Sequence, residues 1–152
     1  KDLFELIGDT KHYLTAFYAK FDIETMELSF TNCGHQKPIL FRTNENKIEL
    51  LDTDGFFIGI MDNYEYEFKT IQMNLNDKLF LYTDGINEAR NEQKECYTNE
   101  RLYDFFLKNG KLEASECIER LIEDINAFCG NRAPDDDRAL LLIEIVANRN
   151  FK

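Results

Sequence analysis

The chain has 152 residues, of which 43% are hydrophobic and 31% are charged, and its formal net charge is −11. This composition is typical of one globular domain with a sizeable core and excludes a disordered chain. The negative charge argues against a nucleic-acid partner, because binding phosphates requires clustered Lys and Arg. No apolar stretch is long enough to span a bilayer, and the first residues do not resemble a signal peptide.

The chain contains four cysteines and two histidines, and no two cysteines form a Cys-x-x-Cys pair. A zinc site is therefore not expected. The even number of cysteines would allow disulfides, but no other feature indicates secretion. We expect buried, reduced thiols and a cytoplasmic location. The cysteines are Cys33, Cys96, Cys117 and Cys129.

The first half of the chain has the alternating pattern of antiparallel strands. Residues 13–21 and 26–33 predict one hairpin, and residues 38–42 and 47–51 predict a second. Residues 64–68 alternate aromatic and charged side chains, which predicts a half-buried strand. Residues 1–9 resemble the end of a helix. We expect Lys37, Lys47 and Lys78 to be ordinary surface lysines.

The second half changes character. An apolar run at residues 79–82 predicts a strand buried on both faces, and polar residues 87–98 predict a loop. Apolar side chains at helical spacing predict helices at residues 99–109 and 114–129, and a glycine follows each. Residues 138–146 predict a last strand. Several strands, two helices and a final strand indicate an α+β sandwich in one domain.

Carboxylates mark one end of two of these strands. Asp84 and Gly85 directly follow the run at residues 79–82, and Asp135, Asp136 and Asp137 directly precede the last strand. If the two strands lie antiparallel side by side, these aspartates meet at one edge of a sheet. Converging carboxylates repel one another unless a cation lies between them. The pattern therefore predicts a site for a hard metal ion.

Four segments resemble, in the right order, the motifs of one enzyme family. Asn32-Cys-Gly-His35 with Pro38 resembles N-A-G-H-x-P-P, and residues 55–59 resemble G-x-P-L-G. Residues 79–89, Leu-Phe-Leu-Tyr-Thr-Asp-Gly-Ile-Asn-Glu-Ala, resemble L-x-L-Y-T-D-G-V-T-E-A, and residues 136–140 resemble D-D-I-T-L. On these motifs the chain resembles the bacterial metal-dependent protein phosphatases (PPM family) of the sporulation stage II protein E type, which include regulators of sigma factors.

The resemblance implies an αββα sandwich of antiparallel sheets flanked by helices, like phosphatase 2C, with two Mn²⁺ or Mg²⁺ ions at one end. It implies hydrolysis of phosphoserine or phosphothreonine on a partner protein, often an anti-sigma factor antagonist. Asp84 and Asp136 match the metal-binding aspartates, and Asp137 matches a position that is less often a direct ligand. A water between two such ions has a lowered pKa and acts as the nucleophile.

Three further residues near these motifs are candidates for the site. Gly85 and Glu88 lie close to Asp84 in sequence, and Glu88 is either a contact to the water around the metal or a surface glutamate. His35 either orients substrate or a metal ligand, or is a turn histidine bonded to the main chain. We assign no catalytic role beyond the metal site.

The chain departs from the family pattern in two places. The D-x-x-G-H-G segment that carries the family's first metal aspartate should precede Thr15, and the fourteen residues before Thr15 do not match it. We therefore expect residues 1–152 to be the C-terminal portion of one phosphatase domain that lacks its N-terminal part. Arg138 and Ala139 replace an apolar residue and a threonine, and Arg138 could form an ion pair with Asp137.

These departures leave an alternative open, namely an inactive phosphatase-like domain that binds another protein. We also expect a sensor or regulatory domain upstream in the parent protein, and no membrane segment in this chain. A sandwich that lacks a segment exposes apolar surface and open sheet edges, so we expect self-association, such as a homodimer, or low stability.

Overall fold

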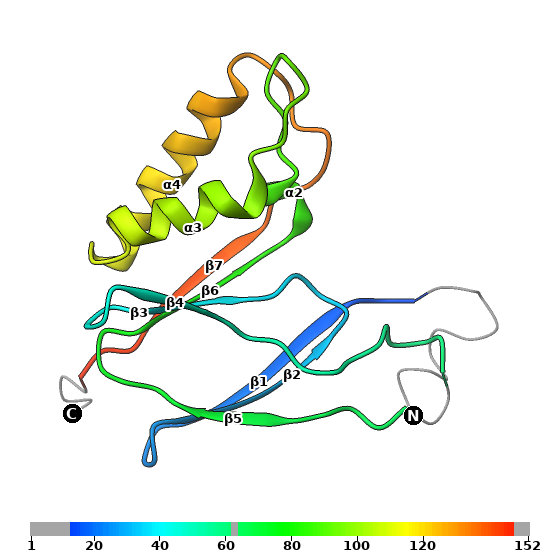
Figure 1. The fold of residues 1–152 in the computed structure, drawn as a ribbon, viewed down its shortest axis with the longest axis vertical. Coiled ribbons are helices and arrows are strands. Elements are labelled where there is room, and N and C mark those ends of the chain that lie inside the picture. Colours follow the sequence, from blue (N-terminus) through cyan, green and yellow to red (C-terminus); the bar gives the residue numbers. More distant parts are fainter. Residues whose placement is uncertain (1–12, 62–63, 148–152) are drawn as a thin grey trace, which may run out of the picture. The chain divides into compact units, whose positions relative to one another are not determined.

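The computed structural model describes residues 13–61 and 64–147, which form two compact units. The first unit contains residues 13–37 and 51–73, and the second contains residues 38–50 and 74–147 (Figure 1). The helix end predicted at residues 1–9 lies outside the described residues.

The first unit is built on a three-stranded antiparallel sheet in the order β1-β2-β5. The first two strands form the predicted hairpin. Its turn is closed by Asp22, whose carboxylate accepts main-chain N–H groups of Glu24 and Thr25 at 2.9 and 3.0 Å. These hydrogen bonds hold the pKa of Asp22 below its usual value. The strands are β1 (Ala16–Asp22), β2 (Glu27–Cys33) and β5 (Lys69–Gln72).

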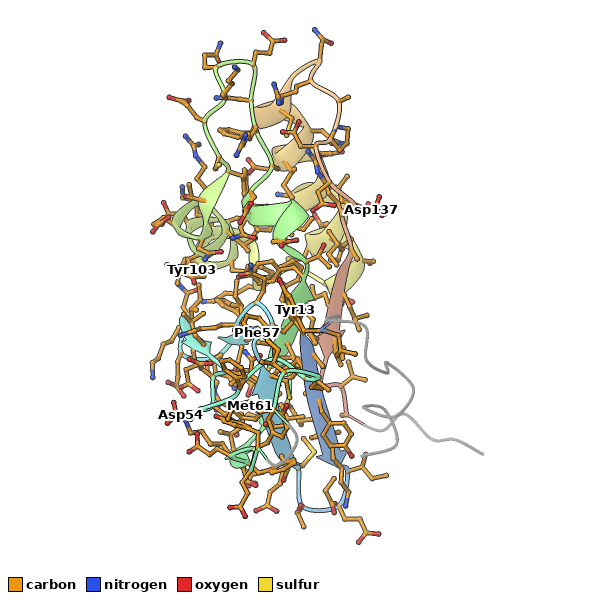
Figure 2. All side chains as sticks on the ribbon, turned by 90° about the vertical axis from the view of Figure 1, so that its right-hand side faces the viewer. Tyr13, Asp54, Phe57, Met61, Tyr103 and Asp137 are labelled. Carbon is orange, nitrogen blue, oxygen red and sulfur yellow. The ribbon has the colours of Figure 1, made fainter. Side chains whose placement is uncertain are left out.

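The prediction of a strand at residues 64–68 is wrong, because these residues form a loop. The strand β5 begins only at Lys69, which is opposite Phe30 of β2. The alternating aromatic residues pack on one another instead, and the Tyr64 and Tyr66 rings meet edge to face at 4.9 Å. Tyr13 and Phe57 form another ring pair in this unit at 5.1 Å (Figure 2). Alternation here reflects packing of aromatic rings along a loop rather than the two faces of a strand.

The second unit contains a four-stranded antiparallel sheet in the order β4-β3-β6-β7 and three helices. The second predicted hairpin, the buried strand, the two long helices and the last strand are all present. The helix predicted at residues 114–129 has those bounds. The strands are β3 (Ile39–Arg42), β4 (Lys47–Leu50), β6 (Lys78–Tyr82) and β7 (Leu140–Glu144), and the helices are α2 (Asp84–Asn87), α3 (Thr98–Asn109) and α4 (Ala114–Cys129).

The core of the second unit lies between one face of this sheet and the helices α3 and α4 (Figure 1). Alternate residues of β3 and β6 point to the helices, and the apolar stripes of the helices meet them. The Phe80 and Phe106 rings, for example, lie 4.9 Å apart. The central members of the cluster are Ile39, Phe41, Phe80, Tyr82, Leu102, Phe106, Leu121 and Ile125. The predicted α+β class with antiparallel sheets is confirmed.

Lys78 is not a surface lysine, contrary to the prediction. Its side chain is 1% exposed, and its Nζ lies 3.1 Å from a carboxylate oxygen of Glu144, the residue opposite it on β7. The other oxygen of Glu144 accepts the main-chain N–H of Ala114 at the start of α4. Lys78 is therefore buried as one half of an ion pair. Lys37 and Lys47, by contrast, have side chains that are 54% and 58% exposed, as predicted.

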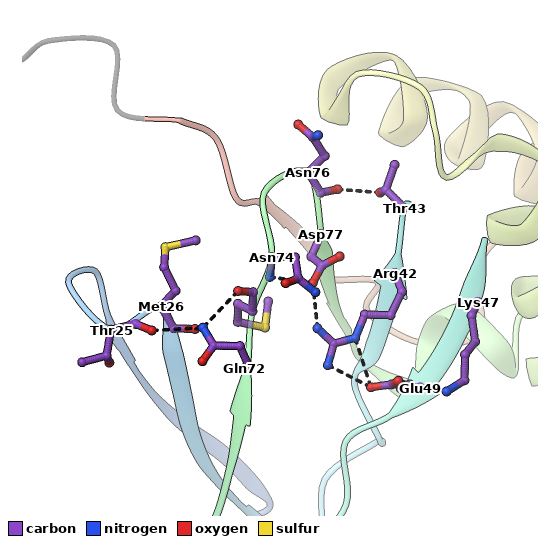
Figure 3. A network of polar contacts seen from close by, with 11 residues as sticks. Thr25, Met26, Arg42, Thr43, Lys47, Glu49, Gln72, Asn74, Asn76 and Asp77 are labelled. Atoms are coloured by element: carbon purple, nitrogen blue, oxygen red, sulfur yellow. Dashed lines mark hydrogen bonds and ion pairs between the residues drawn. The ribbon is translucent and has the colours of Figure 1, made fainter. Parts of the chain in front are cut away.

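A second buried ion pair lies next to the first. Arg42 donates to Asp77 at 2.7 Å and to Glu49 at 3.0 Å, and Asp77 also accepts the main-chain N–H of Asn74 (Figure 3). Burial alone would raise the pKa of Glu49, but hydrogen bonds from Arg42 and Lys47 outweigh it and lower this pKa. We call this part of the sheet, with Arg42, Asp77, Lys78 and Glu144, the closed end.

No helix of the described ranges 13–61 and 64–147 is long and apolar enough to cross a membrane. All four cysteines of the chain lie in these ranges and are free thiols. Cys33, Cys117 and Cys129 are buried, as expected, whereas Cys96 is only half-buried, contrary to the expectation.

Candidate functional site

The pairing of β6 with β7 brings the acidic segments of the sequence to one edge of the sheet. The two strands are antiparallel, as predicted, and Tyr82 is opposite Leu140. Residues 83–85 leave β6 at the edge where residues 135–139 enter β7. We call these two segments the open end. It lies at the opposite end of the strand pair from Lys78 and Glu144.

Thr83 fastens the two segments of the open end together. Its main-chain N–H donates to the carbonyl of Ala139 at 3.0 Å, and its hydroxyl donates to the carbonyl of Asp137 at 3.2 Å. The N–H of Ala139 lies 3.0 Å from the same hydroxyl. Ala139 therefore acts through its main chain, and the threonine side chain that it replaces is not needed for this junction.

Gly85 lets the two segments approach closely. A Cβ atom at this position would lie 2.3 Å from the carbonyl oxygen of Asp137, which is closer than side-chain carbons come to any atom. Only a residue without a Cβ fits here while both main chains stay in place. The glycine after Asp84 thus fixes the spacing between the acidic segments, rather than contacting a ligand by itself.

A cavity of about 200 Å³ opens between α2 and the acidic segment. Most of its polar side chains are acidic, and Asp135 also pairs with Arg132, whose Nη2 lies 2.8 and 3.0 Å from the two carboxylate oxygens. Glu88, one of the sequence candidates, lines the cavity. The lining residues are Gly85, Glu88, Ala89, Arg90, Asp135 and Asp136.

The donor atoms at the open end are those that Mg²⁺ and Mn²⁺ prefer, namely carboxylate oxygens. Asp84 and Asp136 are exposed, and neither forms an ion pair with a described residue. These ligands are too few for a complete metal site. Residues 13–61 and 64–147 contain no group of three or more His, Cys, Asp or Glu residues that could hold a metal ion. The described residues supply the right chemistry for part of a metal site.

The described residues Asp137 and Arg138 do not form the ion pair that their adjacency in sequence allowed. Arg138 instead donates through Nη2 to the sulfur of Cys129 at 3.4 Å, at the end of α4. Asp137 is exposed, and its side chain points outward (Figure 2). Its N–H donates to the carboxylate of Asp136 at 2.7 Å, so Asp137 orients its neighbour through the main chain.

His35 belongs to the first unit, and its contacts lie within that unit. The side chain of Asn32 accepts the N–H of His35 at 2.8 Å and donates to its carbonyl at 3.1 Å. The ring Nδ1 lies 3.2 Å from the hydroxyl of Thr15. These are the contacts expected of a turn histidine held by the main chain, and a role toward substrate stays a prediction.

Two residues of the site were missed in the sequence. Arg90 lines the cavity, and Asn91 closes the loop that follows it. Arg90 directly follows the Tyr-Thr-Asp-Gly-x-x-Glu-Ala block. Its closeness to Asp84 in sequence could have marked it as a candidate for the site. Asn91 opens a polar turn, and asparagine side chains commonly close such turns on the main chain.

Comparison with known proteins agrees with this architecture. Residues 1–146 match the family described as stage II sporulation protein E (SpoIIE). Phosphoserine phosphatase RsbP of Bacillus subtilis is 23% identical over 143 residues, which are 94% of this chain and 34% of that protein. The chain spans between 18% and 34% of the length of the curated relatives that it matches.

Solved structures show the same fold at low sequence identity. The SiaA-PP2C domain of Pseudomonas aeruginosa matches with a TM-score of 0.79 and 17% identity, over 93% of this chain and 55% of that one. The phosphatase domain of SpoIIE from Bacillus subtilis, presoaked with Mn, matches with a TM-score of 0.67 and 15% identity, over 90% of this chain and 58% of that one. The fold is therefore that of PP2C-type phosphatase domains, as expected.

Proposed function

Since the chain belongs to the stage II sporulation protein E family, we propose that it is part of a phosphatase domain that removes phosphate from phosphoserine or phosphothreonine of a partner protein. One observation gives this proposal its strongest support. The antiparallel pairing of β6 and β7 puts Asp84 and Asp136 at one edge of a sheet, next to an acidic cavity. These two aspartates are the positions that the family motifs assign to metal binding.

We propose that Asp84 and Asp136 contribute to a site for Mn²⁺ or Mg²⁺, with two ions in the complete domain. The carboxylate chemistry and the manganese-soaked relative support this. Divalent ions there would supply an activated water and neutralise phosphoryl oxygens. Within this chain, Gly85 and Thr83 hold the spacing of the acidic segments, and the N–H of Asp137 orients the carboxylate of Asp136.

The partner and setting are part of the same proposal. The relative named phosphoserine phosphatase supports a phosphorylated protein as substrate, and the family resemblance favours an anti-sigma factor antagonist in the cytoplasm. We propose that residues 1–152 form the C-terminal portion of the domain, downstream of a sensor or regulatory domain. Homodimer formation stays a prediction, to be tested by light scattering.

A second candidate function is an inactive phosphatase-like domain that binds a partner protein. One observation favours it, namely that the described residues contain no group of three potential metal ligands. Phosphate release from a phosphoserine peptide in Mn²⁺, measured on the parent protein that carries these residues together with its upstream sequence, separates the two. If the protein is a phosphatase, the rate of phosphate release should fall about 100-fold or more in Asp84→Asn and Asp136→Asn. This is the size of effect expected from losing one contact to the transition state.

Asp104→Asn is the matched control, because Asp104 is an exposed aspartate on α3 outside the cavity. Release that does not change in Asp84→Asn, or that needs no divalent ion, would contradict the proposed site. Mn²⁺ binding without any phosphate release would support the inactive binding domain.

A further inference from the structure

Arg90 is the one cationic side chain among the residues that line the acidic cavity. It forms no ion pair or side-chain hydrogen bond with any residue in the described ranges, although Glu88, Asp135 and Asp136 line the same cavity. Asp135 is paired with Arg132 instead. An unpaired guanidinium in a cavity with carboxylates retains all of its N–H groups for an anion.

The main chain on both sides of Arg90 is held by main-chain contacts. Arg90 pairs with Cys96 in an antiparallel bridge, and the N–H of the buried Tyr97 donates to the carbonyl of Ala89 at 2.7 Å. The side chain of Asn91 makes hydrogen bonds within the loop that connects Arg90 and Cys96. The fold therefore places the main chain of Arg90 beside the cavity, and the residue is exposed there.

Asn91 makes an unusually complete set of contacts for a loop residue. It is 8% exposed, and its side-chain oxygen accepts the N–H groups of Gln93 at 3.0 Å and Glu95 at 2.9 Å. Its side-chain nitrogen donates to the carboxylate of Glu95 at 2.8 Å. These three hydrogen bonds tie the loop together directly after Arg90, so we assign Asn91 as a positioning residue for Arg90.

The chemistry of the cavity fits one kind of ligand group. A guanidinium presents two parallel N–H donors that match two oxygens of a phosphoryl group. The carboxylates outnumber the single arginine and would repel a phosphate, unless divalent ions neutralise them. A cavity with both kinds of side chain is suited to a cation and a phosphate together, with the arginine contacting the phosphate.

We propose that Arg90 binds the phosphoryl oxygens of the substrate in this cavity, an assignment that rests on the proposed phosphatase function. The arginine holds the phosphate from the side of the loop at residues 89–97, while Asp136, which lines the cavity, and Asp84, at the same edge of the sheet, provide the metal side. Arg90 is then a substrate-binding residue, and binding of phosphate is stronger when Mg²⁺ is present.

Inorganic phosphate and Mg²⁺, titrated separately and together into the ¹⁵N-labelled chain, test this by NMR. Phosphate in the presence of Mg²⁺ is expected to shift the Nε–H signal of Arg90 and the amide signals of residues 89–97. Arg90→Gln is expected to weaken phosphate binding about tenfold or more, the usual effect of losing charged hydrogen bonds. Arg90→Lys keeps the charge and is expected to retain part of the affinity.

Arg120→Gln is the matched control, because Arg120 is an exposed arginine on α4 that pairs with Glu116. Mg²⁺ shifts at Asp84 and Asp136 without phosphate shifts at Arg90 would overturn the role of Arg90 and leave the metal site standing. Phosphate shifts at Arg90 without Mg²⁺ shifts would support a contact between Arg90 and phosphate, but would contradict both the metal site and the stronger binding of phosphate in Mg²⁺. No response to either ion, or an equal loss in Arg120→Gln, would overturn the assignment of Arg90.

Discussion

The two ends of the strand pair β6–β7 treat charge in opposite ways. At the closed end, Lys78 is buried against Glu144, and Asp77 is buried against Arg42. At the open end, Asp84, Asp136 and Asp137 are exposed, and none of them forms an ion pair with another described residue. The charges at the closed end are therefore neutralised by other side chains of the chain, whereas these three aspartates at the open end remain able to bind a ligand.

This contrast separates structural from functional charge. A buried ion pair such as Lys78–Glu144 must be complete, because one unpaired buried charge is very costly. Exposed carboxylates do not need a partner within the chain for stability, so they can bind a ligand instead. The junction at Thr83 and the close approach at Gly85 hold the open end in place without using the carboxylates of Asp84 or Asp137.

The largest expected effect is at the closed end. Lys78→Met leaves Glu144 unpaired and should lower the free energy of unfolding by about 3–5 kcal/mol, measured by denaturant unfolding. The double variant Lys78→Met/Glu144→Leu should recover most of this loss. Lys47→Met, at an exposed lysine, should cost about 1 kcal/mol or less. Equal losses at Lys78 and Lys47 would show that the closed end is not buried as described.

A smaller effect is expected at the junction of the open end. Gly85→Ala places a carbon against the carbonyl of Asp137 and should cost about 1–3 kcal/mol, because a main-chain segment must move. The amide signals of residues 135–139 should shift with it in NMR spectra. Unchanged stability of the Gly85→Ala variant, together with unchanged signals in that segment, would refute the close approach.

The pH dependence of stability probes the closed end without breaking it. Burial, with help from the nearby carboxylates, raises the pKa of Cys117 to about 11 from an ordinary value of 9.0, against the opposing charge of Lys78. The folded state therefore favours the neutral thiol, and its stabilising effect is present below pH 9 and is lost as pH rises toward 11. The loss should reach about 2 kcal/mol near pH 11.

Cys117→Ala removes this titration, so its free energy of unfolding should approach that of the unchanged chain as pH rises from 9 to 11. Guanidinium unfolding of both proteins over this range provides the measurement. A constant difference between the two proteins would mean that the thiol titrates alike in the folded and unfolded states.

Local patterns predicted much of the second unit. The helix Ala114–Cys129 was predicted with its bounds because apolar spacing and a following glycine are both local signals. Asp84 and Asp136 were expected at one edge of a sheet if their strands pair antiparallel, and this pairing is present. Lys78 was wrongly predicted as a surface residue, because its partner Glu144 is distant in sequence and becomes a neighbour only once the strand register exists.

Other features depended on tertiary contacts that the sequence does not reveal. Tyr64 and Tyr66 alternate like strand residues, yet ring packing in a loop produces the same pattern. An ion pair between Arg138 and Asp137 was possible from their adjacency, but the guanidinium of Arg138 contacts Cys129 at the end of α4 instead. The orientation of long side chains is decided by what packs around them, and adjacency in sequence does not fix it.

The most direct test of the open end is a calorimetric titration of Mn²⁺ into the chain and its Asp84→Asn and Asp136→Asn variants. Because these carboxylates have no described ion-pair partner, both variants should unfold within about 0.5 kcal/mol of the unchanged chain, as expected for surface substitutions. The unchanged chain and Asp104→Asn should bind Mn²⁺, and the other two variants should not. Equal Mn²⁺ binding by all four proteins would contradict a metal site at Asp84 and Asp136.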